Sequence, residues 1–384
     1  MIICESRMRI GILTLPLHTN YGGILQAYAL QTVLERMGHE VVVYQKEIEP
    51  RYELPFWKYP LAYAKRMIKK IFVDRKQPIF VEQKLKKEFP ITRQYTNRFI
   101  KKYIHTVYID SPNDIDLSAV DCIVVGSDQI WRPYHVYNLY KTDVTCAFLK
   151  FAEEWDGKKI VYAASFGMDH WEYDNTQTEE CKRLAKLFDA ISVREQSAIK
   201  LCKDNLEIKA EHVLDPTLLL EKEDYVKLIN NISLPPSDGQ LFNYILDETA
   251  EKRAFVYKIA EQLEMKPYSM SLASWKITDP LNKRIAQPVE KWLRCFFDAK
   301  FVVTDSFHGC VFSIIFGKPF IAIGNEERGM SRFKSLLSMF EMESRLVTSL
   351  DNVNIASIQE HFDESEIVNS LRKHSFNYLH EALG

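Results

Sequence analysis

Short apolar runs alternate with amphipathic segments over most of this chain. The first run, residues 9–15, is followed by a polar turn with Gly22 and Gly23, by helical periodicity over 24–37 and by a second run at 41–44. A strand, a turn, a helix and a second strand in this order predict the opening unit of a doubly wound α/β fold. The turn lacks the GxGxxG spacing, so the pattern does not indicate a dinucleotide.

Further apolar runs predict two sheets. The runs at 121–128, 159–167 and 190–193 continue the first sheet, and those at 212–214, 241–246, 267–270, 301–304 and 319–323 predict a second one. We therefore expect an α/β protein with two doubly wound domains, 1–206 and 207–345, that face each other across a cleft. We expect residues 1–7 to form a loose leader, and 346–384 a C-terminal helical segment that could pack back on the N-terminal domain.

Residues 51–105 interrupt this alternation with a basic helical insertion. Lys and Arg outnumber Asp and Glu there by more than three to one, and Lys65, Arg66, Lys69 and Lys70 fall at helical spacing between apolar positions. Such a patch suits an anionic acceptor, or a peripheral contact with a membrane that carries one. A solvated helical face is the simpler explanation of the same charges, and the functional patch stays open as the alternative.

The composition is that of a globular protein, with 46% hydrophobic and 27% charged residues and a net charge of −2. No charge excess indicates nucleic acid, and no apolar run approaches the roughly 20 residues of a membrane span. The seven cysteines are scattered without a CxxC pair, which favours reduced thiols in a cytosol over disulfides or zinc. We therefore expect a cytoplasmic protein, placed by its insertion at the inner face of the membrane if that contact exists, without a metal ion or resident cofactor.

Polar residues follow the ends of the predicted strands, which is the edge where open α/β sheets bind ligands. They are Asn20, Tyr21, Ser127, Asp128, Gln129, Ser165, Arg194, Asp215, Asp305, Ser306, Phe307 and His308, and Trp131 follows Gln129 by two positions. Asp128, Gln129 and Trp131 could hydrogen-bond sugar hydroxyls and stack on a sugar ring, although the indole could equally belong to the core. We assign Asn20, Tyr21, Gln129 and Trp131 to an acceptor site.

The segment 300–310 carries the strongest signal. A strand ends in Asp305 and Ser306, and His308 then lies in the first turn of an apolar helix, where unpaired backbone N–H groups attract anions. Histidine is the side chain best suited to move a proton near neutral pH. Alternatively, Asp305 or Ser306 only caps the helix and His308 makes a buried hydrogen bond. The companions at the neighbouring strand ends favour the anion and proton-transfer site.

Three arginines could neutralise an anionic ligand. Arg194 follows the strand at 190–193, and its guanidinium suits phosphate or carboxylate, although it could instead pair with Glu195 or another acid. Arg328 and Arg332 follow the strand at 319–323 and are expected near the His308 turn. Asp215 is most simply a cap of the turn after 212–214.

Five segments together resemble the polysaccharide pyruvyl transferase family. They are 19–30, 125–131, 192–195, 214–217 and 304–309, and they occur in the family's order. The resemblance extends from residue 9 to about 340, but the basic insertion and the terminal helix match nothing specific. It implies two Rossmann-like domains arranged as in the GT-B glycosyltransferases. It also implies transfer of a pyruvyl group from phosphoenolpyruvate to a sugar, which yields a ketal.

The resemblance further implies that Arg194 and His308 contact the donor. The candidate catalytic residues are His308 and Asp128, with Asp305 as a second choice for the complementary acid or base. The candidate donor-binding residues are Arg194, Ser306, Phe307, Arg328 and Arg332. The acceptor would be a sugar, or a lipid-linked oligosaccharide, of a surface or exopolysaccharide precursor.

One position departs from the family pattern. Many members carry an arginine two positions before the histidine, where this chain has Ser306. Either Arg328 or Arg332 supplies that charge, or the donor differs. Two rival functions fit the same residues: a nucleotide-sugar-dependent glycosyltransferase, and a glycan-binding relative without turnover.

Overall fold

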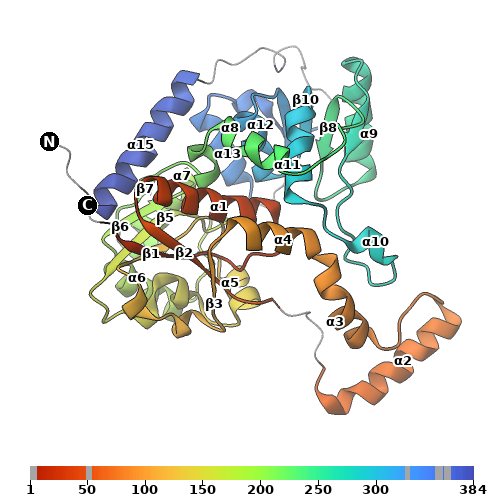
Figure 1. Cartoon of the computed structure of the whole chain (residues 1–384), viewed down its shortest axis with the longest axis horizontal. Coiled ribbons are helices and arrows are strands. Elements are labelled where there is room, and N and C mark those ends of the chain that lie inside the picture. The colour runs from red at the N-terminus through yellow and green to blue at the C-terminus, as the bar shows by residue number, and fades with distance from the viewer. Residues whose placement is uncertain (1–6, 49–53, 325–328, 351–357, 359–364) are drawn as a thin grey trace.

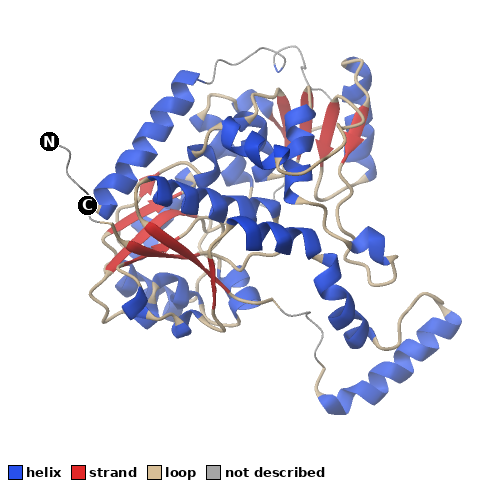
Figure 2. Cartoon of the chain, in the orientation of Figure 1, coloured by secondary structure: helices blue, strands red, loops and turns tan. Residues whose placement is uncertain are grey.

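The computed structural model describes residues 7–48, 54–324, 329–350, 358 and 365–384. It contains two separate parallel sheets with helices packed around them, as Figure 2 shows. The predicted α/β class with two doubly wound units is therefore confirmed. Most of the predicted leader, residues 1–6, lies outside the described residues, as does Arg328.

The first sheet has seven strands in the order β3-β2-β1-β4-β5-β6-β7. The strands are β1 (Arg9–Leu13), β2 (Glu40–Gln45), β3 (Thr106–Tyr108), β4 (Cys122–Val125), β5 (Lys158–Ala164), β6 (Ala190–Val193) and β7 (Glu211–His212). All neighbours are parallel. The strand order reverses between β1 and β4, so a ligand crevice is expected beyond their carboxyl ends. All four residues of β4 are buried, as expected for a central parallel strand covered on both faces.

The second sheet has five strands in the order β12-β11-β10-β8-β9, again all parallel. The strands are β8 (Leu241–Tyr244), β9 (Pro267–Ser269), β10 (Phe301–Thr304), β11 (Phe320–Ile323) and β12 (Leu346–Val347). Here the order reverses between β8 and β10, so a ligand crevice is again expected beyond the carboxyl ends of those two strands.

Helices fill the connections between the strands (Figure 1). Those of the first unit are α1 (Tyr21–Arg36), α5 (Pro133–Tyr140), α6 (Asn175–Ala185) and α7 (Gln196–Leu201). Those that follow β7 are α8 (Lys222–Asn230), α9 (Ala250–Gln262), α10 (Leu281–Arg284), α11 (Val289–Asp298), α12 (Phe307–Ile315) and α13 (Met330–Met339). Helix α1 is followed by Gly38 at φ +99°, a left-handed conformation that suits glycine and ends the helix.

The predicted boundary between the units is wrong in one respect. His212 was expected to begin the second sheet, but β7 pairs in parallel with β6 and is the last strand of the first sheet. A two-residue strand has no hydrophobic periodicity of its own, so only its neighbour could assign it. The short strands β3 and β12 carry too little pattern to be predicted for the same reason.

The two units share one buried core. Tyr21 at the start of α1 stacks on Trp292 of α11, with ring centroids 5.7 Å apart. Arg36 at the end of α1 donates two hydrogen bonds to the Asp224 carboxylate of α8, at 2.7 and 2.9 Å. The buried cluster around these contacts runs without a break from β1 to α12. The second unit therefore packs along the whole length of α1.

The predicted basic insertion is helical and connects the two units. It contains the turn η1 (Phe56–Lys58) and the helices α2 (Tyr59–Phe72), α3 (Val81–Thr92) and α4 (Gln94–Tyr103). Helix α4 packs on α1 through Phe99, whose ring lies 6.0 Å from that of Tyr28. Helix α3 contacts the second unit, because the Ala286 amide donates to the Thr92 carbonyl at 2.8 Å and Arg284 pairs with Glu88.

The C-terminal helix α15 (Ser365–Leu383) packs against the first unit. The Tyr378 hydroxyl donates to the Val161 carbonyl of β5 at 2.7 Å, and the Leu214 amide donates to the Ser375 hydroxyl at 3.0 Å. The chain thus crosses from the second sheet back to the first.

Within the described residues, no helix is long and apolar enough to cross a membrane. The cysteines in this part of the chain are buried and unpaired with one another.

Candidate active site

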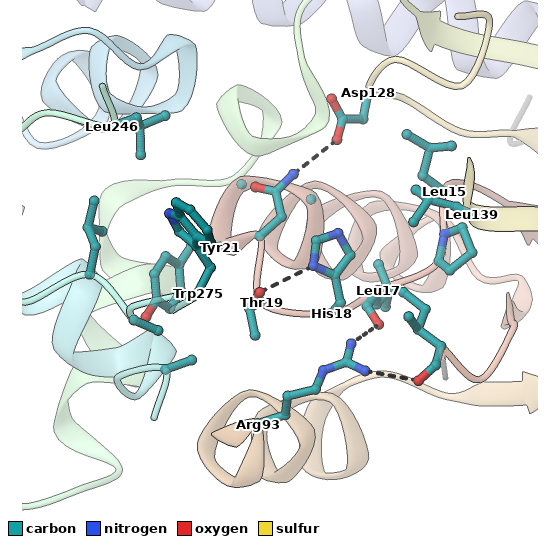
Figure 3. Close-up of a pocket in the computed structure, with 18 of the residues that line it drawn as sticks. Leu15, Leu17, His18, Thr19, Tyr21, Arg93, Asp128, Leu139, Leu246 and Trp275 are labelled. Carbon is teal, nitrogen blue, oxygen red and sulfur yellow. Dashed lines mark hydrogen bonds between the residues drawn. The ribbon is translucent and has the colours of Figure 1, made fainter. Parts of the chain in front are cut away.

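A cavity of about 840 Å³ lies between the carboxyl ends of the two sheets (Figure 3). The segments after β1 and β4 line one side, and those after β8 and β10 line the other. Phe89, Thr92 and Arg93 of the insertion form a further part of the wall. Both strand-order reversals therefore open onto the same space, as the rule for open α/β sheets predicts.

Two helix N-termini meet at His308. The imidazole belongs to the first turn of α12, and its Nδ1 lies so close to Gly22 of α1 that a Cβ built there would be 2.1 Å away. Only glycine lets the ring approach α1 this closely. Ser306 caps α12 by accepting from the Gly309 amide at 3.3 Å, whereas Asn20 makes no side-chain cap on α1. The first turn of α1 therefore offers backbone N–H groups to an anion.

A buried carboxylate, that of Asp215, lies beside the imidazole of His308. Asp215 Oδ2 lies 3.6 Å from His308 Nε2 and 2.8 Å from Arg194 Nη1. The other oxygen accepts from the Thr217 amide at 3.0 Å and from its hydroxyl at 2.6 Å. Asp215 was interpreted from the sequence as a cap, and it does cap the turn η7 (Pro216–Leu219). It also joins the two units, which a cap signal alone could not reveal.

These contacts keep Asp215 ionised. Burial alone would raise the pKa of the carboxyl, but His308, Arg194 and Thr217 together hold that pKa well below its usual range. Charge-assisted contacts of this kind favour the ionised form of a carboxyl group. A fixed carboxylate 3.6 Å from Nε2 can orient the ring.

Asp128 is held in a strained conformation at the end of β4. Its φ of 67° lies in the left-handed region, which asparagine and aspartate tolerate better than most residues. Its carboxylate lines the cavity and accepts from the Asn20 amide at 3.5 Å. Burial raises the pKa of Asp128, but Arg194 and His308 outweigh that effect and lower it overall. Strain retained at a cavity wall is typical of a functional position.

Arg194, Phe307 and Arg332 lie behind the cavity wall. Arg194 pairs with Asp215 and, at 3.5 Å, with Asp128, whereas Glu195 accepts from Ser165. The Phe307 ring lies 4.4 Å from the Arg194 guanidinium and 5.9 Å from that of Arg332. Burial, followed by the neighbouring Arg194 charge, lowers the pKa of Arg332 to about 10. In this structure Arg194 pairs with both carboxylates, and none of the three residues lines the cavity.

Two arginines that line the cavity, Arg93 and Arg284, were not predicted from the sequence, and Arg284 pairs with Glu88. Arg93 is buried at the junction of α3 and α4, and it donates to the carbonyls of Ile48 and Leu17 at 3.4 and 3.5 Å. Burial lowers its pKa to about 10, so the guanidinium is charged at neutral pH. No carboxylate within the described residues forms an ion pair with it. In the sequence it was one of many charges in a basic block, so no signal distinguished it.

Two predicted roles are corrected by the structure. Trp131 is fully buried, stacks on Phe148 at 4.7 Å and donates its indole N–H to the Ala147 carbonyl at 3.3 Å. It therefore cannot stack on a sugar, and the core alternative holds. Asp305 is also fully buried, where it accepts from the Leu246 amide at 2.6 Å and pairs with Lys252 at 2.7 Å. It stabilises the loop after β8 and cannot serve as the complementary acid or base.

The other predicted acceptor residues do line the cavity. Asn20, Tyr21 and Gln129 are all in its wall, with Ser306 and His308 nearby. The Tyr21 hydroxyl donates to the Gln287 carbonyl at 3.0 Å, and its ring stacks on Trp292.

Further cavity residues escaped the sequence analysis. They are His18, Tyr134, His135, Trp275 and Arg284. Trp275 is 87% exposed and offers a ring to a bound sugar. In the described part of the chain, no group of three His, Cys, Asp or Glu could hold a metal ion.

Residues 20–327 match the family model described as polysaccharide pyruvyl transferase. No curated protein matches the sequence. The match includes β4, β8 and β10 and both helices that meet at His308, and it begins after β1.

Several solved structures are similar over nearly their whole length. UGT89C1 of Arabidopsis thaliana, complexed with UDP-L-rhamnose, is 10% identical with a TM-score of 0.48 and coverage of 99% of this chain and 98% of that chain. The UDP-GlcNAc 2-epimerase of Neisseria meningitidis, bound to UDP-GlcNAc, is 9% identical with a TM-score of 0.48 and coverage of 97% and 99%. MurG of Acinetobacter baumannii is 10% identical with a TM-score of 0.42 and coverage of 98% of both chains. These TM-scores are all below 0.5, so we assign the fold class from the two parallel sheets of this chain.

Asp215→Asn should destabilise the protein by about 3–5 kcal/mol at neutral pH, because it leaves Arg194 buried with a weaker partner. Urea denaturation of the two proteins measures the difference. The folded-state pKa of Asp215 lies below its unfolded value, so the wild-type advantage is complete above about pH 4 and shrinks as the pH falls further.

The matched control is Asp238→Asn, which removes an exposed ion pair with Lys266 and should cost less than about 1 kcal/mol. Equal losses of unfolding free energy in the two variants would show that the buried pair stabilises the protein no more than an exposed one.

Proposed function

The chain belongs to the polysaccharide pyruvyl transferase family, and we propose that it transfers a pyruvyl group from phosphoenolpyruvate to a sugar of a surface or exopolysaccharide precursor. The observation that carries this proposal is the meeting of two helix N-termini at His308, in a cavity that Arg93 also lines. The product would be a pyruvate ketal.

The cavity suits a small donor with two anionic groups. Phosphoenolpyruvate carries a phosphate and a carboxylate, and backbone N–H groups at a helix start bind either of them. Helix α1 has no side-chain cap, so its first turn can receive one group, and Arg93 is available for the other. A guanidinium binds carboxylate and phosphate through paired hydrogen bonds. The donor would thus lie with its methylene carbon near His308.

The proposed reaction moves two protons. The His308 imidazolium protonates the methylene carbon, which makes C2 electrophilic, while Asp128 accepts the proton of the first sugar hydroxyl as its oxygen bonds to C2. A second hydroxyl of the sugar then attacks C2 and gives its proton to the neutral His308. The C–O bond to phosphate breaks, and Asp128 returns its proton to the leaving phosphate. Both residues regain their starting states, and ketal and inorganic phosphate are the products.

The surroundings of the two residues support these roles. Asp215 lies 3.6 Å from His308 Nε2 and can orient the ring for proton transfer. The pKa of Asp128 is lowered by Arg194 and His308, so its carboxylate is ionised and can accept one. Tyr21, Gln129 and Trp275 line the same cavity and suit a sugar acceptor.

His308→Ala should lower phosphate release from phosphoenolpyruvate by roughly 10²–10⁴-fold, the usual range for loss of a general acid or base. The assay contains phosphoenolpyruvate and fractionated surface glycans, and follows inorganic phosphate together with a mass gain on the glycan. His170→Ala is the control, because that imidazole is exposed and outside the cavity. Turnover at the wild-type rate in His308→Ala would refute the assignment.

The rival functions are separated by thermal-shift measurements on the wild-type protein. Stabilisation by phosphoenolpyruvate supports the proposal. Stabilisation by a nucleotide sugar alone would identify a glycosyltransferase, and stabilisation by glycan with neither donor would identify a binding protein without turnover.

Arg93→Gln should weaken phosphoenolpyruvate binding by about 10–100-fold, since a hydrogen bond to a charged group contributes about 1.5–3 kcal/mol. Calorimetric titration of the protein with phosphoenolpyruvate, in the absence of a sugar, measures this change in affinity without turnover. Lys101→Gln removes one positive charge from the exposed side of the neighbouring helix α4 and should bind as the wild type does. If both variants lost affinity equally, net charge rather than the Arg93 guanidinium would explain the effect.

Gly22→Ala should reduce turnover about a hundredfold while the protein stays folded. The added Cβ would displace the His308 ring, and a shift of about 1 Å in a catalytic group has an effect of this size. Alanine favours a helix over glycine by up to about 1 kcal/mol, so a general loss of stability is not the expected cause. Thr32→Ala, at the other end of α1, is the control. Unchanged turnover in Gly22→Ala would mean that the ring position is not critical.

A further inference from the structure

Helix α2 presents an apolar face to solvent. Figure 1 shows it at the far end of the insertion, projecting away from both sheets. None of its residues is buried. Its outward face consists of Leu61, Met67, Ile68, Ile71 and Phe72, which are between 49% and 79% exposed. Positions 61, 68 and 72, and likewise 67 and 71, are spaced so that they share one side of a helix. An ordinary surface helix turns such a stripe inward, so this one requires an explanation.

The inward side of α2 is already occupied. The Tyr63 ring lies 5.0 Å from that of Phe80, and Arg66 makes two hydrogen bonds of 2.7 Å to Glu82 at the start of α3. These contacts fix the rotation of the helix about its axis. The apolar stripe therefore cannot turn inward without breaking a paired arginine, and it needs a partner from outside.

Basic residues lie along one edge of the outward face. Lys65 and Lys69 are exposed on α2 one turn apart, next to Leu61 and Phe72 on the helix surface. Lys58 and the 65% exposed Trp57 precede the helix. Between residues 54 and 73 the chain has five Lys or Arg and no Asp or Glu. An apolar stripe with a tryptophan at one end and lysines along its edge is the pattern of a helix that lies in a membrane interface.

We propose that the outward face of α2 docks on an anionic lipid bilayer. The apolar side chains would enter the boundary between headgroups and acyl chains, while Lys65 and Lys69 extend toward lipid phosphates. The charge also argues against a second copy of this chain as the occupant. A self-contact through α2 would set the same lysines against each other, with no carboxylate between residues 54 and 73 to pair with them.

The docking helix is linked directly to the cavity. Arg66 and Glu82 join α2 to α3, and α3 ends at the cavity residues Thr92 and Arg93. A protein held by α2 would therefore present the insertion side of the cavity to the bilayer. This consequence rests on the proposed function, because it favours an acceptor carried by a lipid. The docking itself does not, and it can be tested without turnover.

The experiment is co-sedimentation of the full chain with vesicles. One set contains equal parts of phosphatidylglycerol and phosphatidylcholine, and the other contains phosphatidylcholine alone. The wild type should bind the first set strongly, bind the second weakly, and dissociate from the first as salt is added. The double variant Ile68→Ser with Ile71→Ser should lower binding to the first set at least tenfold. The double variant Lys65→Gln with Lys69→Gln should lower it about tenfold and reduce its salt dependence.

The controls test whether vesicle binding depends on this surface or on any exposed ring and any exposed lysines. Tyr257→Ser removes an exposed aromatic ring from α9, and Lys101→Gln with Lys102→Gln removes the same charge from α4. Both should bind as the wild type does, and all variants should keep the wild-type melting temperature. Failure of the wild type to bind, or equal losses in the controls, would overturn the proposal. A dimer in light scattering that Ile68→Ser with Ile71→Ser dissociates, without vesicle binding, would assign the face to a second copy.

Discussion

The structure depends above all on one buried carboxylate. Asp215 lies in the turn after the last strand of the first sheet, and it contacts Arg194 at the end of β6 and His308 on the first turn of α12. An isolated charge is too costly to bury, so all three groups must be in place together. Because His308 belongs to the second unit, the same contact fixes that unit against the first. The position of His308 and the alignment of the two domains are thus one constraint.

The insertion closes the cavity that this constraint opens. Two facing sheets leave a gap that is open at its side, and the α3 and α4 helices fill it by packing on α1 with one end and on residues 284–290 with the other. Arg93, at the junction, is buried against the carbonyls of Leu17 and Ile48. The same segment therefore supplies a wall, a bridge between the units and a positive charge. A deletion of the insertion would remove all three.

The sequence predicts the fold well because its signals are local. Long apolar runs identify β1, β4, β5 and β10, and the polar residues at their ends are enough to place Asn20, Asp128 and His308 at one edge. Trp131 shows one limit of prediction from sequence, because an indole after a strand end can face either the core or the cleft, and only the packing decides. Arg93 and Asp215 show a second limit. Their importance comes from contacts across the domain boundary, which neither spacing nor composition records.

The serine at position 306 can be understood from the same geometry. Ser306 is the N-cap of α12 and accepts from the Gly309 amide, so its short side chain keeps the first turn of the helix in place beside His308. An arginine there could not cap the helix in this way, but it would bring a charge to the donor. In this chain the cavity receives a guanidinium from the insertion instead, through Arg93. Cap and charge are then supplied by different elements. Under the proposed function, Ser306 and the basic insertion are two parts of one arrangement. The charge for the donor would come from the segment that also carries α2, the helix that we propose docks on a bilayer.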